Sequence, residues 1–280
     1  MLLSREAGIV SLSPQRKRDR VDLHAGVFLA LFFAAIGIGG FASFLGLGGG
    51  VFMVPLLSLG GFVATMPEAV GTSIAGIVFT SLSSSIAYAL KRKINIKLGL
   101  LLMPTTVFGA WCGARLTEVI DTKLLSIAFG VFLLYPMSMM LLGKPPKEIP
   151  FSFHGKMRGV RLYAITAAIG LIAGTASGLF GIGGGTVMVP SLSVFLGLDI
   201  SITVATSLFV MAPSALMGSY QHWMQGNLHP ELALPLILGL VIGAQIGPRL
   251  GVRLPKVRLR QIFGVVLLYA AVNMIIKGIK

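Results

Sequence analysis

The stretch Leu45-Gly46-Leu47-Gly48-Gly49-Gly50-Val51-Phe52-Met53-Val54-Pro55 interrupts a long apolar run. Glycine and proline both destabilise a helix interior, so this stretch predicts a helix that breaks within apolar chain. The stretch recurs 135 positions later as Phe180-Gly181-Ile182-Gly183-Gly184-Gly185-Thr186-Val187-Met188-Val189-Pro190, with seven of eleven residues identical. Two such breaks indicate an internal duplication.

Three further matches follow in the same order and at nearly the same offset. Thr72-Ser73 matches Thr206-Ser207, residues 107–116 match 241–250 at six of ten positions, and residues 129–135 match 263–269 at six of seven. The chain is therefore predicted to contain two homologous halves. The expected boundaries are a basic N-terminal tail at 1–23, a first membrane repeat at 24–143, a cytoplasmic linker at 144–158 and a second membrane repeat at 159–280.

The composition excludes a water-soluble protein. Of the 280 residues, 55% are hydrophobic and 11% are charged, whereas soluble domains carry about 25% charged residues. Mean hydropathy is +0.90, and apolar stretches long enough to span a bilayer recur along the chain. We expect an all-α integral membrane protein with four long transmembrane helices and one short Gly/Pro-broken helix segment in each half. The expected spans are 25–45, 69–90, 98–116, 124–143, 160–180, 201–224, 232–250 and 259–277, and the short segments are 51–65 and 186–198.

The net charge of +14 lies mainly in loops between the apolar spans. Short positive loops stay in the cytoplasm and orient membrane helices, so we expect no nucleic-acid partner. Loop 91–97 of the first half is basic, whereas its counterpart 225–231 in the second half has no Lys or Arg. For the next pair of loops the second half is the basic one: 249–260 has five basic residues and no acid, whereas 115–126 has no net charge. The opposite bias predicts an inverted repeat, which is the plan of many secondary transporters.

An inverted repeat requires an odd number of crossings in each half, so the short segment must supply a fifth crossing or a partial one. Five crossings would put the N-terminal tail outside the cell, although residues 16–20 are strongly basic. The alternative is that the first break forms a re-entrant loop and leaves the tail inside.

The two breaks are the candidate substrate site. Broken backbone at membrane depth is tolerated where it is buried or lines a cavity, and its free N–H groups at a helix N-terminus attract anions. Close helix packing is the alternative explanation for the glycines. Hydroxyls that follow the breaks could donate to an anion, or else bond to helix backbone. The predicted substrate-binding residues are Gly48, Gly49, Gly50, Gly183, Gly184, Gly185, Thr72, Ser73, Thr206 and Ser207.

The remaining polar residues do not indicate catalysis. Glu68, Asp199 and Glu231 lie near predicted span ends, and His222 is expected at the membrane interface. Cys112 is the single cysteine, so no disulfide can form within the chain and no cysteine metal site is expected. The sequence has no visible nucleophile–base pair or metal cluster, and we predict neither an enzyme nor a bound metal or cofactor.

A resemblance to the sulfite exporter TauE/SafE family is carried by the duplicated glycine motif, Gly71-Thr72-Ser73, Ala205-Thr206-Ser207, the basic loop and the overall length. The resemblance covers nearly the whole chain and implies a multi-pass permease in the bacterial cytoplasmic (inner) membrane. It implies a small anionic substrate that contains sulfur, such as sulfite or an organosulfonate. The expected mechanism is alternating access of the halves around the breaks. The alternative is an anion channel or a carrier for another small organic anion.

Overall fold

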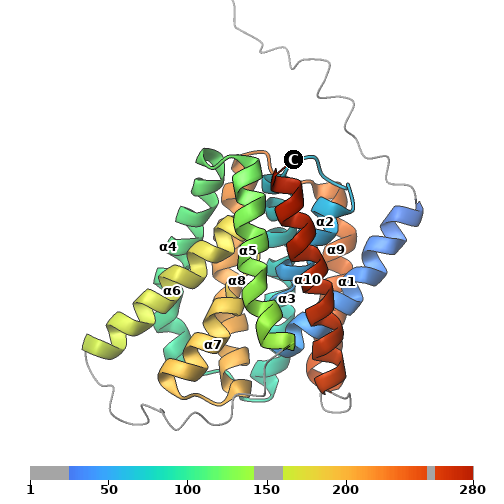
Figure 1. The fold of residues 1–280 in the computed structure, drawn as a ribbon. Coiled ribbons are helices and arrows are strands. Elements are labelled where there is room, and N and C mark those ends of the chain that lie inside the picture. Colours follow the sequence, from blue (N-terminus) through green and yellow to red (C-terminus); the bar gives the residue numbers. More distant parts are fainter. Residues whose placement is uncertain (1–24, 142–159, 251–255, 280) are drawn as a thin grey trace, which may run out of the picture.

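The computed structural model describes residues 25–141, 160–250 and 256–279, which form helices joined by short turns (Figure 1). The predicted tail (1–23) and linker (144–158) lie outside these ranges. The helices in chain order are α1 (Ala25–Leu45), α2 (Gly50–Leu59), α3 (Met66–Leu90), α4 (Ile96–Val119), α5 (Thr122–Leu141), α6 (Val160–Phe180), α7 (Gly185–Leu196), α8 (Ile200–Met224), α9 (Pro230–Leu250) and α10 (Lys256–Ile279).

Seven of the described helices are long and apolar enough to cross a membrane, namely α1, α3, α4, α6, α8, α9 and α10. Large apolar side chains are exposed on them, including Phe33 at 65%, Ile86 at 60% and Leu216 at 60%. Such exposure is unfavourable in water but not against lipid chains. The prediction of an all-helical integral membrane protein is therefore confirmed.

Most of the packing joins the first half of the chain to the second. α3 packs against α8, and α5 packs against α10 at the front of Figure 1. α1 packs against α9, and α6 packs against α4. The sequence repeat matches α1 with α6, α3 with α8, α4 with α9 and α5 with α10. The packing therefore follows the repeat: α3 and α5 pack against their own counterparts, and the α1–α9 pair corresponds to the α6–α4 pair.

The matched helices that touch each other run antiparallel. Gly71, near the start of α3, faces His222 near the end of α8. Asn95, just after α3, bonds to Thr206 near the start of α8. In the same way, Gly264 near the start of α10 faces Leu141 at the end of α5.

α1 and α9 instead run parallel, along a seam of glycines. A Cβ on Gly239 would clash with the carbonyl of Phe32, and a Cβ on Gly247 would clash with the carbonyl of Gly40. Glycine allows the two backbones to approach this closely. α4 and α6 form the equivalent parallel seam through Gly109, Gly113, Gly170, Gly174 and Gly178.

The charges of the described residues differ between the two ends of the bundle. What we call the basic end carries Lys91, Arg92, Lys93 and Lys97 around the α3–α4 turn, together with Arg249 and a single acid, Asp199. What we call the acidic end carries the acids Glu68, Glu118, Asp121 and Glu231, together with the bases Arg115, Lys123 and Lys277. The turns of the acidic end touch one another, because Glu68 pairs with His229 and Gln225 Nε2 donates to the Ala114 carbonyl.

Each short helix follows a glycine break that reverses the direction of the chain. α1 runs parallel to α9 and so begins at the acidic end. α2 returns to that end, where Lys277 Nζ donates to the Ser58 carbonyl at 2.8 Å. Within the described residues, α1 thus starts and α2 ends at the same end of the bundle. Whether the short segment crosses the membrane, and on which side the tail lies, stay predictions. Hydropathy could not decide this, because a crossing segment and a returning segment are equally apolar.

Candidate substrate site

Two glycine breaks separate α1 from α2 and α6 from α7. In the first break, φ is 74° at Gly46, 75° at Gly48 and 96° at Gly49. In the second break, φ is 64° at Gly181, 81° at Gly183 and 74° at Gly184. This left-handed region strains any residue that has a Cβ, so the reversals of the chain depend on glycine.

The two breaks meet in the interior of the bundle. A Cβ on Gly50, the first residue of α2, would clash with the carbonyl oxygen of Gly181. A Cβ on Gly185, the first residue of α7, would clash with that of Gly46. The predicted glycines of both halves therefore form one buried cluster, in which backbone touches backbone at two reciprocal contacts.

Two matched apolar side chains occupy the space beside the breaks. A Cβ on Gly48 would clash with Met211 Cε of α8 and lie 3.3 Å from Ile77 Cγ2 of α3, and Gly183 faces the same two residues. Ile77 and Met211 are both fully buried. The described form is thus closed around the breaks, and a bound anion would require these side chains to move.

Ser73 and Ser207 each reach across to the break of the other half. Ser73 Oγ lies 3.1 Å from the Gly181 carbonyl, and Ser207 Oγ lies 3.5 Å from the Gly46 carbonyl. Each hydroxyl also contacts the carbonyl three residues earlier in its own helix at 2.9 Å. A serine has one proton to donate, so in the closed form these protons are directed at carbonyl groups.

Thr72 and Thr206 each accept a hydrogen bond from a turn of the other half. The N–H of His229, between α8 and α9, donates to Thr72 Oγ1 at 3.2 Å. The N–H of Asn95, between α3 and α4, donates to Thr206 Oγ1 at 3.0 Å. In the closed form these hydroxyls form hydrogen bonds within the protein, which is one of the two roles predicted for them. Their part in substrate binding stays a prediction.

The short helices begin at the breaks with uncapped N-termini. Gly49 and Gly184 are the N-cap residues of α2 and α7, and neither helix has a side-chain cap or an acidic residue in its first turn. Each start presents free N–H groups and the positive end of a helix dipole to the interior. Thr186, in the first turn of α7, adds a buried hydroxyl without a hydrogen-bond partner, where the first half has Val51.

His222 lies in the last turn of α8 but is fully buried, so the expectation of an exposed histidine at the interface is wrong as regards exposure. Its Nε2 lies 3.0 Å from the Gly178 carbonyl in the last turn of α6, and its Nδ1 has no partner. The repeat matches His222 with Tyr88, whose hydroxyl lies 3.4 Å from the Ser43 carbonyl in the last turn of α1. The histidine is buried because α3 and α6 both pack against α8, which the sequence of α8 alone does not indicate.

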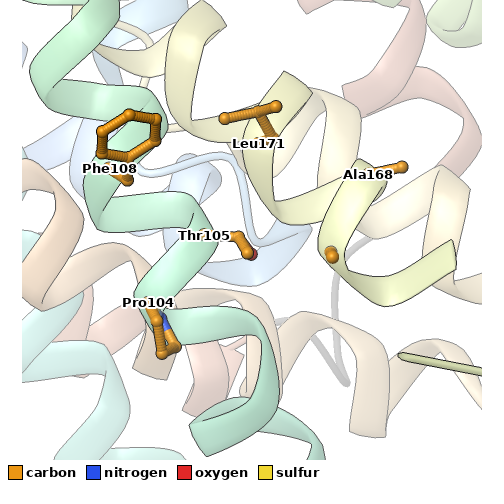
Figure 2. A pocket seen from close by; sticks show the side chains of 6 residues that line it. Pro104, Thr105, Phe108, Ala168 and Leu171 are labelled. Atoms are coloured by element: carbon orange, nitrogen blue, oxygen red, sulfur yellow. The ribbon is translucent and has the colours of Figure 1, made fainter. Parts of the chain in front are cut away.

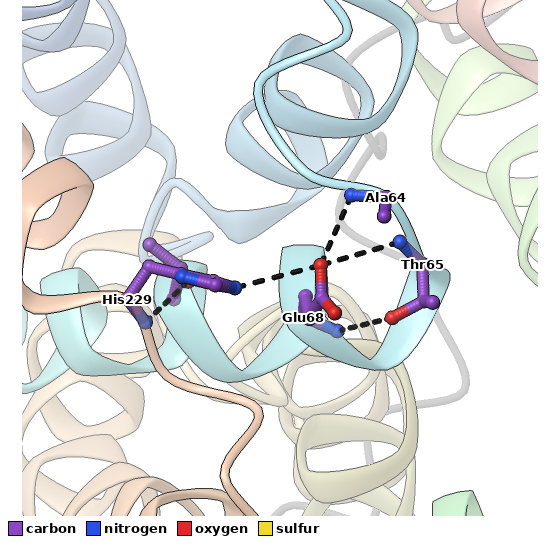
Figure 3. A network of polar contacts seen from close by, with 5 residues as sticks. Ala64, Thr65, Glu68 and His229 are labelled. Atoms are coloured by element: carbon purple, nitrogen blue, oxygen red, sulfur yellow. Dashed lines mark hydrogen bonds and ion pairs between the residues drawn. The ribbon is translucent and has the colours of Figure 1, made fainter. Parts of the chain in front are cut away.

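A polar network joins the halves at the acidic end (Figure 3). Glu68 accepts from the N–H groups of Ala64 and Thr65 at 3.0 and 3.3 Å and so helps to cap α3. His229 Nε2 lies 3.4 Å from the Glu68 carboxylate. The hydrogen bond with Glu68 raises the pKa of His229 above its usual value of 6.5, while burial acts in the opposite direction.

An apolar depression of about 380 Å³ lies between α4 and α6 (Figure 2). Pro104, Thr105 and Phe108 line it from α4, and Ala168 and Leu171 line it from α6. Its lining carries no charge and does not include the residues of either break. An anion would find little to bind there, and the apolar lining suits contact with lipid.

An apolar helical bundle in which two glycine-broken helices meet has the architecture of a membrane transporter. Residues 9–274 match the sulfite exporter TauE/SafE family. The match covers most of the sequence, and the chain belongs to this family.

The chain is also similar to three probable membrane transporters. The chain is 30% identical to the "Probable membrane transporter protein YunE" of Bacillus subtilis, over 90% of this chain and 98% of that protein. It is 30% identical to the probable membrane transporter YdhB of the same organism, over 71% and 79% of the two chains. It is 27% identical to a probable membrane transporter of Xylella fastidiosa, over 86% and 93%. No solved structure matches the chain.

Proposed function

We propose that this protein is a secondary transporter that moves a small sulfur-containing anion, such as sulfite or an organosulfonate, across the bacterial cytoplasmic (inner) membrane. The observation that carries the proposal is the meeting of the two glycine breaks, where α2 and α7 begin without caps. Helix N-termini bind anions through N–H groups and the dipole, without a buried positive side chain. The sulfur-containing class rests on the family assignment.

The proposed site comprises the N–H groups of Gly48, Gly49 and Gly50 and of Gly183, Gly184 and Gly185, which would bind the oxygens of the anion. The hydroxyls of Thr72, Ser73, Thr206 and Ser207 would complete the site by exchanging their present contacts for the anion as the site opens. The unpartnered Thr186 hydroxyl already lies beside the start of α7. It is available to an anion without the loss of an existing bond.

We further propose that the halves form an inverted repeat. The antiparallel packing of the matched pairs α3–α8 and α5–α10 supports this, because repeats of opposite orientation place matched helices in opposite directions. The positive charges of Lys91, Arg92 and Lys93 favour a cytoplasmic location for the basic end. The start of α1 then lies on the outer side.

Alternating access would break the contacts at one end of the bundle at a time. The His229–Thr72 bond holds the α8–α9 turn at the acidic end, and the Asn95–Thr206 bond holds the α3–α4 turn at the basic end. In the described form both bonds are made, which is consistent with a state closed to both sides. Opening to one side would release one bond and keep the other.

The test is uptake of labelled sulfite into proteoliposomes that contain only this protein, with unlabelled sulfonates and sulfate as competitors. We expect saturable sulfite uptake, and we expect unlabelled anions of the transported class to suppress it. A fixed stoichiometry with an imposed ion gradient would distinguish a carrier from an anion channel. Folded protein that moves none of these anions would contradict the proposed substrate class and leave the family assignment unchanged.

A further inference from the structure

We infer that His222 is the proton-binding group of this transporter, and that one proton on its Nδ1 travels with the anion. The inference builds on the proposed function, because it adds a co-transported ion to the anion. The ring of His222 lies against the last turn of α6, directly before the second glycine break. Among the side chains whose exposure the structure describes, no other His, Asp, Glu, Lys or Arg is buried.

The protonation state of the neutral ring follows from its hydrogen bond. Nε2 lies 3.0 Å from the Gly178 carbonyl, and a carbonyl can only accept, so Nε2 carries the hydrogen. Nδ1 of the neutral ring is then a bare lone pair, and it has no partner in the buried interior. Because the ring is fully buried in the described form, opening of the bundle would have to bring water to Nδ1. A proton could then bind to this lone pair from one side and leave to the other.

The matched position in the first half shows that a packing role does not require histidine. Tyr88 occupies it, and the Tyr88 hydroxyl contacts the Ser43 carbonyl as His222 Nε2 contacts the Gly178 carbonyl. Both side chains thus tie a central helix to the last turn of a broken helix. Histidine adds a second ring nitrogen whose charge can change between pH 5 and 8.

Proton and anion would favour each other's binding. A protonated ring beside the second break adds a positive charge next to the proposed anion site, and the anion in turn offsets the cost of that buried charge. The charged group that acts on the His222 ring is Glu118 of α4. The Glu68–His229 pair of α3 and the α8–α9 turn lies at the same end, where Glu231 of α9 acts on His229. The described last turns of α6 contribute no charged group.

The experiment compares His222→Tyr and His222→Gln with the unmodified protein in proteoliposomes. Tyrosine copies the first half, and glutamine keeps an N–H donor for the Gly178 carbonyl without a titratable nitrogen. Labelled sulfite exchange is measured first, with sulfite on both sides and no pH gradient. Accumulation is then measured under an inward proton gradient of about one pH unit, which raises the limiting ratio about tenfold for one proton per anion.

We expect both variants to retain sulfite exchange and to lose the gradient-driven accumulation. Because all proteins meet the same mixture of sulfite and bisulfite, a difference between them reports the protein and not the substrate. Tyr88→Phe and Glu68→Gln are the controls, and both should keep the response to the gradient.

Three results separate this inference from the proposed function. Full gradient-driven accumulation by His222→Gln would overturn the inference, and so would an unmodified protein that exchanges sulfite but ignores the gradient. An unmodified protein that exchanges no sulfite would contradict the proposed function instead.

Discussion

The two halves share a backbone plan but differ in the side chains around their breaks. In the first half, Tyr88 and Val51 occupy the positions that His222 and Thr186 occupy in the second half. The first pair leaves no buried polar atom without a partner, whereas His222 Nδ1 and Thr186 Oγ1 are both unpartnered. Among the described residues, Ser177, Thr186 and His222 thus place buried side-chain atoms without a hydrogen-bond partner beside the second break, whereas Ser85 of α3 is the one such residue in the first half.

The glycines that the fold requires are the same in both halves, whereas the side chains that could contact the substrate differ. The glycines are duplicated because each break needs left-handed backbone and direct contact with the other break. The neighbouring side chains are not needed for the left-handed backbone, and they differ between the halves, as at Val51 and Thr186. Substitutions at matched positions therefore test which role each residue has.

The largest effect is expected for alanine at the two reciprocal contacts. In Gly50→Ala and Gly185→Ala, the new Cβ would clash with backbone carbonyls, which cannot move aside as a side chain can. We expect a loss of about 3 kcal/mol or more of stability in each variant and no transport. Yield, thermal unfolding in detergent and uptake measure this. Normal transport by either variant would show that the breaks do not interlock.

A smaller and unequal effect is expected at the N-cap glycines. A Cβ on Gly184 would lie 2.7 Å from the Ala173 carbonyl, whereas a Cβ on Gly49 would lie 3.4 Å from Ile38 Cγ2, an ordinary contact. Valine at either position should abolish transport, because both residues have positive φ. Gly184→Ala should lower the melting temperature more than Gly49→Ala, and the reverse order would contradict the described geometry.

A third substitution separates binding from stability. Thr186→Val removes an unpartnered hydroxyl, so the melting temperature should stay unchanged or rise. If this hydroxyl binds the anion, KM for sulfite should increase about fivefold, which corresponds to about 1 kcal/mol. Thr186→Ser should restore KM, and Val51→Ala is the matched control with little effect. An unchanged KM in Thr186→Val would exclude the hydroxyl from the site.

The smallest effect is a pH dependence confined to the acidic end. Because its partner raises the pKa of His229, the stability from this pair is fully present below about pH 6.5 and is lost as pH rises through the raised pKa. The pair is partly exposed, at 35% and 23%, so we expect less than about 1 kcal/mol.

Melting temperatures measured between about pH 6 and pH 9 test this dependence. His229→Asn copies the matched Asn95 of the basic end and should remove the dependence in this range. Glu68→Gln should remove it as well. A dependence that survives both substitutions would have to come from another group.

The sequence predicted the helices well where local composition decides them. α1 and α6 begin and end with their apolar runs, at 25–45 and 160–180. α2 ends at Leu59, earlier than the expected 65, because Gly60 and Gly61 follow it. The breaks themselves could be found because glycine and proline act within their own stretch of chain.

The partners of the polar residues could not be predicted, because they come from distant segments. Ser73 is bonded to Gly181, 108 positions away, and the burial of His222 depends on helices outside its own. Ile77 and Met211 were missed as well. They are apolar residues in apolar helices, and nothing in their spacing distinguishes a side chain that fills the site from one that faces lipid.

The glycine seams have a consequence for the order of assembly. α6 meets a partner, α4, that has already been synthesised, but α1 must wait for α9, which begins at Pro230. At about 5–20 residues per second, that delay is on the order of ten seconds or more. We therefore expect α1 to remain without its seam partner in the bilayer until α9 has been synthesised.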